Sequence, residues 1–209
     1  MKYKFVVSGA AETGHCAVDA DKKAYDIGQE IDKKAYDIGQ EIVKHNGILI
    51  TGATSGIPNF AAEGAKKAGG ISIGISPAAS YAAHVKSYKL PTEHYDFIIY
   101  TGFDYSGRNL LLTRSADAVI VICGRIGTLN EFTIAFEDNK PIGVLEGSGG
   151  TADEIRHIIE IGHRGKGKIV YDSDPKRLIE KVVVLIDKEH KGLEDAASKE
   201  ENEFALGRE

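Results

Sequence analysis

Cysteine, proline and tryptophan are scarce: the 209-residue sequence has 2 cysteines, 5 prolines and no tryptophan. Cys16 and Cys123 lie far apart along the chain and in no metal-ligand spacing. We therefore expect no disulfide framework, and cysteine usage of this kind favours an intracellular location. The seven histidines form no cluster with metal-ligand spacing, so no metal site is predicted.

Long apolar runs and a basic stripe are also missing. The N-terminal stretch MKYKFVVSGA has an apolar run too short for a signal peptide or a membrane span, and no later run is long enough. The formal net charge is −5, with both signs mixed along most of the chain, which argues against a nucleic-acid backbone as partner. We expect a soluble, cytoplasmic protein that binds neither nucleic acid nor a membrane.

Glycine is abundant, with 24 residues, and apolar residues make up 42% of the chain, enough for the core of one sizeable α/β domain. Short β-branched runs alternate with helical patterns, which predicts a doubly wound, mainly parallel sheet of about seven strands flanked by helices. Several runs are apolar throughout, as in strands buried on both faces. The predicted strands are 3–9, 47–52, 70–76, 97–102, 118–124, 141–147 and 168–172, and the predicted helices lie near 16–45, 58–68, 107–116, 128–138, 151–162 and 174–189.

In such a sheet, ligands bind beyond the carboxyl ends of the strands, near the point where the strand order reverses. The glycine-bearing segments SGAAETG, TGATSG, TGFDYSG and CGRIGTL all follow predicted strands, so the functional site should lie at that edge. We assign residues 1–189 to a single domain and residues 190–209 to a charged, aperiodic tail that we expect to be disordered.

The segment DKKAYDIGQEI occurs twice in tandem, at 21–31 and 32–42, without a single difference. Because natural repeats diverge, an identical pair indicates either engineering, such as a designed switch or a helix insertion, or a recent duplication. Eleven residues advance an α-helix by about three turns, which keeps the apolar positions of both copies on one face. One copy either lengthens the first helix, by about 16 Å, or loops out, and the glycine in each copy permits both outcomes. The isoleucines on this face are Ile27, Ile31, Ile38 and Ile42.

The segment ICGRIGTLNEF, at 122–132, follows an apolar run and opens a helix. Free backbone N–H groups and the helix dipole favour an anion near Gly124, Gly127 and Thr128. Thr128 can act as the N-cap of this helix or donate its hydroxyl to a phosphate. Glu131, three residues later, also fits a capping box with Thr128. This segment alone therefore supports a well-capped helix and an anion site equally.

A second segment, GRNLLLTRSADAVIVICG, places Arg108 at the start of a helix after the predicted strand 97–102. Arg108 and Glu131 should therefore share the carboxyl edge of the sheet. An arginine beside a glutamate can orient the acid and bind a substrate oxygen. The alternative is a surface ion pair, which contributes little stability.

Together these segments resemble the LOG-like family, which includes proteins once labelled lysine decarboxylases and the molybdenum-cofactor carrier proteins. The resemblance runs from about Tyr3 to Leu145 and includes SGAAETG, ITGATSGIPNFAAEGAKKAGG, IGISP and the pair formed by RNLLLTRSADA and CGRIGTLNE. That pair is similar to the family pattern of an arginine followed by lysine or asparagine, then a turn of the form PGGxGTxxE. The resemblance implies a Rossmann-like fold, a homodimer or higher homo-oligomer, and a nucleotide site at the carboxyl edge.

For the cytokinin-activating members, the resemblance implies cleavage of the N-glycosidic bond of a nucleoside 5′-monophosphate to free base and ribose 5-phosphate, without a metal or another cofactor. Carried over by position, it assigns catalytic roles to Arg108 and Glu131. Glu131 would stabilise positive charge on the ribose ring, and Arg108 would hold Glu131 ionised. The implied phosphate- and nucleotide-binding residues are Ser8, Gly9, Gly52, Thr54, Ser55, Gly56, Gly124, Arg125, Gly127 and Thr128.

Several positions depart from the hydrolase pattern. Arg125 stands in place of the second turn glycine, Cys123 in place of the leading proline, and Asn109 in place of the lysine. Arg108 followed by Asn109 resembles the carrier branch, which binds molybdopterin-like ligands and does not need to turn them over. Two hypotheses therefore stand: a nucleotide N-glycosidase, and a non-catalytic carrier or sensor of a phosphorylated nucleotide or pterin-like ligand. An engineered helix-duplication variant of such a protein fits the sequence as well.

Overall fold

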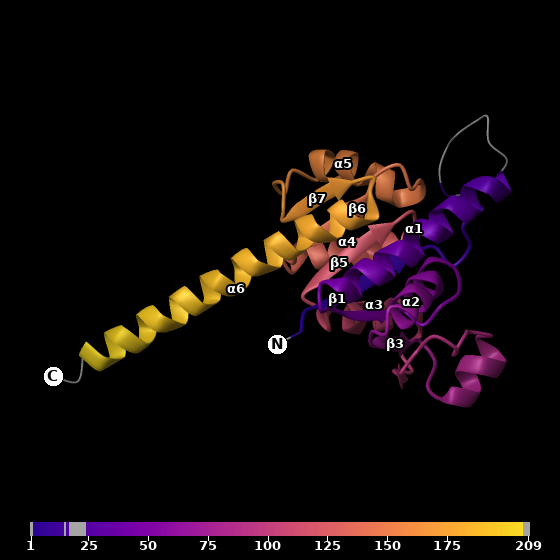
Figure 1. Ribbon diagram of the computed structural model, residues 1–209, viewed down its shortest axis with the longest axis horizontal. Helices are drawn as coiled ribbons and strands as arrows, with labels where there is room; N and C mark the ends of the chain where they lie inside the picture. The colour runs from indigo at the N-terminus through magenta and orange to yellow at the C-terminus, as the bar shows by residue number, and fades with distance from the viewer. Residues whose placement is uncertain (1, 15, 17–23, 207–209) are drawn as a thin grey trace.

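The computed structural model describes residues 2–14, 16 and 24–206, with side chains described except at 24–27 and 194–206. Seven parallel strands form one sheet in the order β4-β3-β2-β1-β5-β6-β7, with helices between them (Figure 1). The predicted α/β, doubly wound fold is confirmed. The strands are β1 Lys4–Gly9, β2 Ile48–Thr51, β3 Ser72–Ser76, β4 Phe97–Tyr100, β5 Ala118–Ile122, β6 Ile142–Leu145 and β7 Ile169–Asp172, and the α-helices are α1 Ala24–Lys44, α2 Ile57–Lys67, α3 Asp104–Arg114, α4 Ile126–Glu137, α5 Gly150–Gly162 and α6 Pro175–Leu206.

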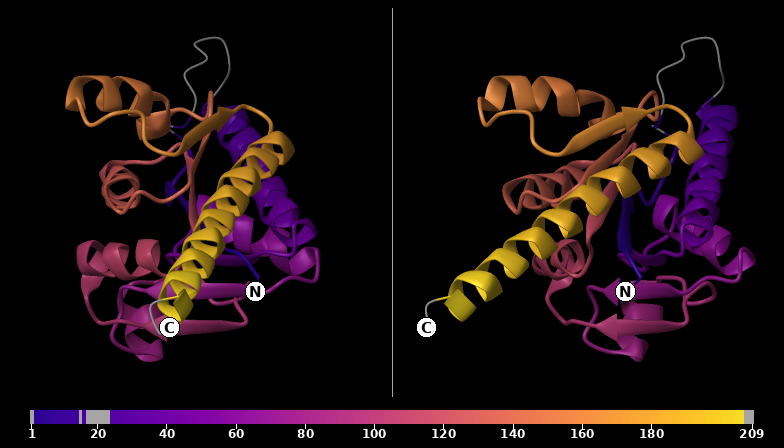
Figure 2. Two further views of the ribbon diagram at one scale, coloured as in Figure 1. Left: turned by 90° about the vertical axis from the view of Figure 1, so that its left-hand side faces the viewer. Right: turned by 60° about the vertical axis from the view of Figure 1, so that its left-hand side comes forward.

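The helices cover both faces of the sheet, as the two views of Figure 2 show. Alternate residues of a strand point to opposite faces, so Phe5 and Val7 of β1 belong to one buried cluster and Val6 to the other. The cluster on the Phe5 side includes buried residues of α1, α2 and α6. The cluster on the Val6 side includes buried residues of α3, α4 and α5. Because both faces are buried, β5 is buried at every position, as its continuous apolar run predicts.

The strand order reverses between β1 and β5, the two central strands. The chain steps outward from β1 through β2 and β3 to β4, then returns so that β5 pairs with the other side of β1. Register pairs Ser8 with Val121 and Gly9 with Ile122, which brings the carboxyl ends of both strands level. The segments that follow these strands therefore meet at the switch point, where open α/β sheets bind ligands.

The duplicated segment lies in α1, which includes residues 24–31 of the first copy and the whole second copy. The second copy packs on the core, with Ala35, Ile38 and Ile42 fully buried, and Ile31 of the first copy is also buried. Residues 21–23 and the side chain of Ile27 lie outside the described residues. The first copy thus extends α1 at its N-terminal end, which is the lengthened-helix alternative.

Two glycines let α1 and α2 cross closely. A Cβ at Gly39 of the second copy would overlap the carbonyl oxygen of Ala61 on α2. A Cβ at Gly64 on α2 would overlap the carbonyl oxygen of Tyr36 on α1. For Gly28, the counterpart of Gly39 in the first copy, the described atom nearest to such a Cβ is Oγ1 of Thr13, at 3.3 Å. The two copies are identical in sequence, yet their glycines have different neighbours in the fold.

The expectation of no disulfide is wrong: Cys16 and Cys123 are joined, with their Cα atoms 5.5 Å apart. They are separated by 107 positions in the sequence. Cys16 lies in the segment after β1, and Cys123 directly follows β5. These strands are neighbours only because of the strand order, which sequence spacing does not reveal. The cysteine argument for an intracellular location no longer holds, and that location stays a prediction.

Two further elements differ from the predicted ones. A short π-helix at Ala83–Ser87, between β3 and β4, was not predicted. Helix α6 extends to Leu206 and runs away from the sheet (Figure 1), so it continues past the predicted helix near 174–189 and through residues 190–206 of the tail that we expected to be disordered. Residues 207–209 lie outside the described residues. Among the described helices, none combines the length and the apolar character that crossing a membrane requires.

Candidate functional site

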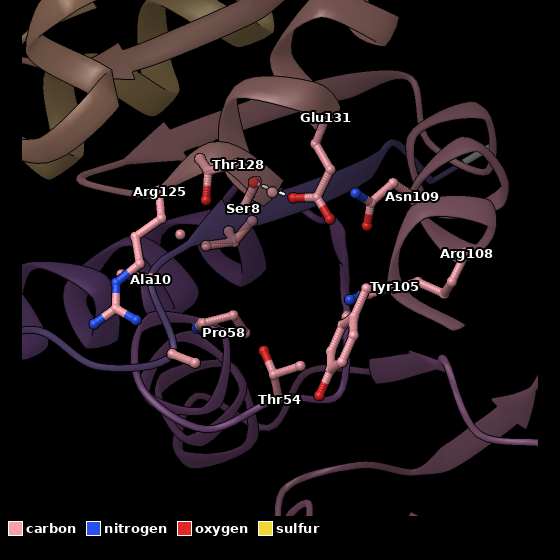
Figure 3. A pocket seen from close by; sticks show the side chains of 15 residues that line it. Ser8, Ala10, Thr54, Pro58, Tyr105, Arg108, Asn109, Arg125, Thr128 and Glu131 are labelled. Atoms are coloured by element: carbon pink, nitrogen blue, oxygen red, sulfur yellow. Dashed lines mark hydrogen bonds between the residues drawn. The ribbon is translucent and has the colours of Figure 1, made fainter. Parts of the chain in front are cut away.

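A cavity of about 190 Å³ opens at the carboxyl edge between β1 and β5, which is the switch point of the sheet. It receives residues from the segments after β1, β2 and β5 and from helices α2, α3 and α4 (Figure 3). Its lining consists of Val7, Ser8, Gly9, Ala10, Ala11, Gly52, Thr54, Pro58, Tyr105, Arg108, Asn109, Arg125, Gly127, Thr128 and Glu131.

Glu131 points from α4 toward the end of β1, where the hydroxyl of Ser8 donates a hydrogen bond to its Oε2 (Figure 3). The Asn109 nitrogen donates to Oε1 of Glu131 and to the carbonyl of Tyr105, both at 2.8 Å, in the amide orientation in which the Asn109 oxygen faces Asn130, and Asn130 then presents its own amide nitrogen to that oxygen. Each carboxylate oxygen then accepts one hydrogen bond from a residue of another element. These contacts hold Glu131 in one orientation.

Burial sets the ionisation of this carboxyl group. Glu131 is 6% exposed, and desolvation disfavours the charged form of an acid. Burial therefore raises the pKa of Glu131 above its ordinary value of 4.5, while the positive charge of Arg108 and the hydrogen bond from Ser8 lower it by less. Arg108 acts in the predicted direction, favouring the ionised acid, but burial has the larger effect.

Arg108 is 4% exposed and lines the cavity. Its Nε and Nη1 have no hydrogen-bond partner in the described part of the chain, and its Cζ lies 5.9 Å from the ring centre of Tyr105. Gly52 makes room for it, because a Cβ there would overlap the guanidinium. Burial lowers the pKa of Arg108 and the negative charge of Glu131 raises it, yet an arginine stays charged in proteins. Arg108 is therefore a buried cation whose Nε and Nη1 have unsatisfied donors within the described part of the chain.

The N-terminus of α4 forms another wall. The helix begins at Ile126 after Arg125, without a side-chain cap and without an acid in its first turn. Thr128 is therefore not the N-cap, and Glu131 bonds to Ser8 rather than forming the capping box that the spacing allows. The first N–H groups of a helix lack partners inside the helix. Gly127 and Thr128 carry two of these groups and line the cavity, so this wall favours an anion.

Arg125 lies at one edge of the cavity, beside Ala10 of the segment after β1 (Figure 3). Its Nη2 lies 2.7 Å from Oε2 of Glu12, with the Arg125 side chain 56% and the Glu12 side chain 77% exposed. Arg125 therefore neither fills the cavity nor lies buried in it. It adds a positive charge at the rim.

The structure brings most of the predicted site residues to the cavity and leaves three outside its lining. Ser55 is exposed and bonds to the carbonyl of Ala11 at 3.3 Å. Gly56 adopts a φ of +68° next to the carbonyl of Ala10. Gly124 adopts a φ of +98° and packs against Thr128. Glycine is needed at both because positive φ is strained for other residues. The predicted residues that line the cavity are Ser8, Gly9, Gly52, Thr54, Arg108, Arg125, Gly127, Thr128 and Glu131.

Sequence reasoning did not assign several lining residues to the site. Asn109 was noted only as a departure from the hydrolase pattern, and its contact with Glu131 has no signal in the sequence. Tyr105 also lines the cavity without having been predicted as a site residue. The lining residues Val7, Ala10, Ala11 and Pro58 are apolar neighbours of predicted positions, placed there by the adjacency of β1 and α2.

Comparison with known proteins agrees with this architecture. Over 143 residues the chain is 29% identical to an uncharacterized protein of Archaeoglobus fulgidus, covering 68% of this chain and 82% of that protein. The molybdenum cofactor binding protein of the phototrophic bacterium Rippkaea orientalis is 26% identical, with a TM-score of 0.67 over 89% of this chain and 98% of that one. A Moco carrier protein of Chlamydomonas reinhardtii is 25% identical, with a TM-score of 0.68 over 90% and 99%.

These similarities confirm the resemblance to LOG-like proteins. Residues 2–179 match the SLOG cluster4 family, a span that includes the whole sheet and every residue of the cavity lining. The chain therefore belongs to the SLOG cluster4 family.

Proposed function

We propose that this protein binds a phosphate-bearing nucleotide or pterin-like ligand in the cavity between β1 and β5, as a carrier or sensor. The observation that carries the proposal is the buried Arg108, whose Nε and Nη1 have no hydrogen-bond partner in the described part of the chain. A buried donor without a partner costs about 1–3 kcal/mol, more when the group is charged. An anionic ligand that accepts from Arg108 would remove this penalty.

The phosphate would lie against the N-terminus of α4. Gly127 and Thr128 supply backbone N–H groups there, and Arg125 adds a charge at the rim. The rest of the ligand would extend past Glu131 toward Tyr105 and Thr54. A ring stacked on Tyr105 fits both a purine and a pterin.

A carrier or sensor role has support from the state of Glu131. Ser8 and Asn109 each donate to one carboxylate oxygen, and burial raises the pKa of the acid. A carboxylate that must stabilise a developing positive charge works best when ionised and directed at the substrate. The similar proteins from Rippkaea orientalis and Chlamydomonas reinhardtii are described as binding or carrying the molybdenum cofactor, which is a pterin ligand.

Calorimetric titration with adenosine 5′-monophosphate (AMP), adenosine and inorganic phosphate tests this proposal. We expect AMP to bind more tightly than adenosine, because only AMP reaches both the ring region and the helix N-terminus. Arg108→Gln should weaken AMP binding at least tenfold. Arg114→Gln is a matched control on the same helix, since Arg114 is exposed and paired with Asp138, and it should leave the affinity unchanged. The proposal fails if neither AMP nor a phosphorylated pterin binds to the wild-type protein.

Hydrolysis of a nucleoside 5′-monophosphate is the second candidate, and the cavity supports it because Arg108 and Glu131 both line the same space. Glu131 would stabilise the positive charge of the ribose ring as the N-glycosidic bond breaks, and water would complete ribose 5-phosphate. The test is release of ribose 5-phosphate from a panel of monophosphates. Release that disappears in Glu131→Gln would support a phosphoribohydrolase, whereas binding without release would support the carrier.

We further propose that the protein assembles as a homodimer or higher homo-oligomer. Large apolar side chains are exposed on the edge strand β4, at Phe97 and Ile99, and on α3, at Leu110 and Leu111. Exposed apolar groups that lie near one another mark interaction surfaces, and an unpaired edge strand invites pairing. Light scattering on the purified protein gives the mass directly, and a strictly monomeric protein at micromolar concentration would refute the assembly.

A further inference from the structure

The wall of the cavity formed by the segment after β1 is connected to the wall formed by the turn after β5. Ala10 and Ala11 line one side, while Arg125, Gly127 and Thr128 line the other. Among the described residues, these walls are joined by the disulfide between Cys16 and Cys123 and by the ion pair between Glu12 and Arg125. The ion pair is largely exposed, and such pairs contribute about 0–1 kcal/mol. The disulfide is therefore the main connection.

The turn after β5 is itself firmly anchored. The N–H of Cys123 donates to the hydroxyl of Ser148 at 2.8 Å, and the carbonyl of Cys123 accepts from the N–H of Ala152 at 2.8 Å. The carbonyl of Gly124 accepts from the N–H of Thr151 at 3.1 Å. Cys123 thus provides a fixed attachment point.

The segment after β1 is held by hydrogen bonds of Ala10, Ala11 and Thr13, the last of these to the side chain of Asp32. The carbonyl of Ala10 accepts from the N–H of Ile57, and the carbonyl of Ala11 accepts from the exposed Ser55 hydroxyl at 3.3 Å. Beyond Ala11, Cys16 fixes this segment to the turn covalently. Loss of that bond would leave the far end of the cavity wall without its strongest connection.

We propose that the Cys16–Cys123 disulfide is a redox-responsive site that sets ligand affinity in the cavity, an inference that rests on the proposed function. A dithiol reductant supplies two electrons: its thiolate attacks one sulfur, the S–S bond breaks, and its second thiol closes to release a cyclic disulfide. The protein gains two protons and has two thiols. The cavity wall at residues 10–14 then loosens, and the phosphate-bearing ligand binds more weakly because its site is less preorganised.

Ligand and reductant should oppose each other. Cys16 and Cys123 are 1% and 0% exposed, so a reductant reaches the bond only when the segment after β1 moves away from the turn. A ligand that contacts both walls resists this movement. Linkage is reciprocal. If the oxidised protein binds the ligand ten times more tightly than the reduced protein, a saturating ligand lowers the reduction potential of the disulfide by about 30 mV.

The experiment uses the full chain and three readouts. Alkylation and mass measurement, before and after dithiothreitol, count the free thiols. Hydrogen–deuterium exchange compares residues 10–14 and 124–128 in the oxidised and reduced protein without any ligand. Calorimetry measures the AMP affinity of both forms, with circular dichroism to confirm that the reduced protein stays folded.

We expect no alkylation before reduction, two alkylated cysteines after it, faster exchange at residues 10–14, and AMP affinity at least threefold weaker in the reduced form. Full alkylation of air-purified protein without reductant would overturn the proposal, as would unchanged exchange at residues 10–14 or equal AMP affinities. If neither AMP nor a phosphorylated pterin binds either form, the proposed function fails, and the exchange measurement, which needs no ligand, still decides whether the disulfide restrains the wall.

The variant Cys16→Ser separates the disulfide from other effects of the reductant. Cys16 lies in the segment after β1 rather than in the strand, so its replacement disturbs the sheet less than replacement of Cys123. This variant should match the reduced protein in exchange and in AMP affinity, and dithiothreitol should not change it further. If dithiothreitol changes Cys16→Ser as much as it changes the wild type, the effect does not come from this disulfide.

Discussion

Ser8, near the end of β1, donates a hydrogen bond to Glu131 of α4 across 123 positions of sequence (Figure 3). Both side chains are buried. The bond connects the two central strands of the sheet at the cavity, because α4 directly follows β5. Ser8 therefore positions the acid, which is a role that its place in a glycine-bearing segment did not predict.

Removal of this hydroxyl should destabilise the protein. In Ser8→Ala, Oε2 of Glu131 loses its donor while remaining buried, and a hydrogen bond to a charged group contributes about 1.5–3 kcal/mol. We expect the free energy of unfolding, measured by urea denaturation, to fall by about that amount. Ser55→Ala is the control, since its exposed hydroxyl makes one 3.3 Å bond and its loss should change stability by less than ~0.5 kcal/mol. Equal effects of the two variants would contradict the positioning role.

The raised pKa of Glu131 predicts a pH dependence with a definite sign. An acid whose pKa is higher in the folded than in the unfolded protein stabilises the fold below the unfolded value, and this contribution is lost as pH rises through the folded pKa. Since the ordinary value is 4.5, wild-type stability should decline relative to Glu131→Gln as pH rises from 4.5 toward neutrality. Urea midpoints of both proteins across this range give the comparison. Parallel curves would mean that burial does not dominate the pKa.

The identical copies of the duplicated segment allow a matched test of helix packing. Gly39→Ala would place a Cβ against the carbonyl of Ala61, and overpacking of this kind costs about 1–3 kcal/mol. Gly28→Ala makes the same change in the same local sequence, but the nearest described atom to the added Cβ is Oγ1 of Thr13 at 3.3 Å, against a backbone carbonyl oxygen at 2.0 Å for Gly39. There the higher helix propensity of alanine offers up to about 1 kcal/mol of stabilisation. Thermal unfolding should separate the two variants, and the opposite ranking would place the first copy, rather than the second, against α2.

The charges of Arg125 and Glu12 at the mouth of the cavity should change the affinity for AMP without changing the stability of the fold. Arg125→Ala removes a positive charge from the mouth of the cavity, and Glu12→Gln removes the negative charge that faces it. We expect AMP affinity to fall in the first variant and to rise in the second, each by up to about fivefold, the ratio that corresponds to ~1 kcal/mol. Both proteins should unfold within ~0.5 kcal/mol of the wild type. Changes of the same sign would show that Arg125 acts through structure rather than charge.

The local pattern of apolar and polar residues was sufficient to predict the strands and the α-helices. The seven described strands and six described α-helices all overlap the segments that apolar runs and helical patterns predict, because periodicity depends only on neighbouring residues, although α6 continues to Leu206, past its predicted end near 189. The π-helix at Ala83–Ser87 has no such periodicity and was missed. The carboxyl-edge location of Arg108, Thr128 and Glu131 also follows from the chain alone, since each lies just after a predicted strand.

Contacts between distant segments were decided by the tertiary structure. The strand order places β1 beside β5, and from this adjacency follow the bond between Ser8 and Glu131, the disulfide between Cys16 and Cys123, and the ion pair between Glu12 and Arg125. None of these pairs has a fixed spacing that a pattern could reveal.

The sequence by itself determined the alternation of elements, the edge of the sheet that carries the site, and most residues of the cavity lining. Only the tertiary structure decided which of two identical copies packs against α2, which partner holds Glu131, and that burial outweighs Arg108 in setting the pKa of the acid. The physical reason is the same in each case. Propensity and periodicity act over a few residues, whereas packing, desolvation and pairing depend on which surfaces the fold brings together.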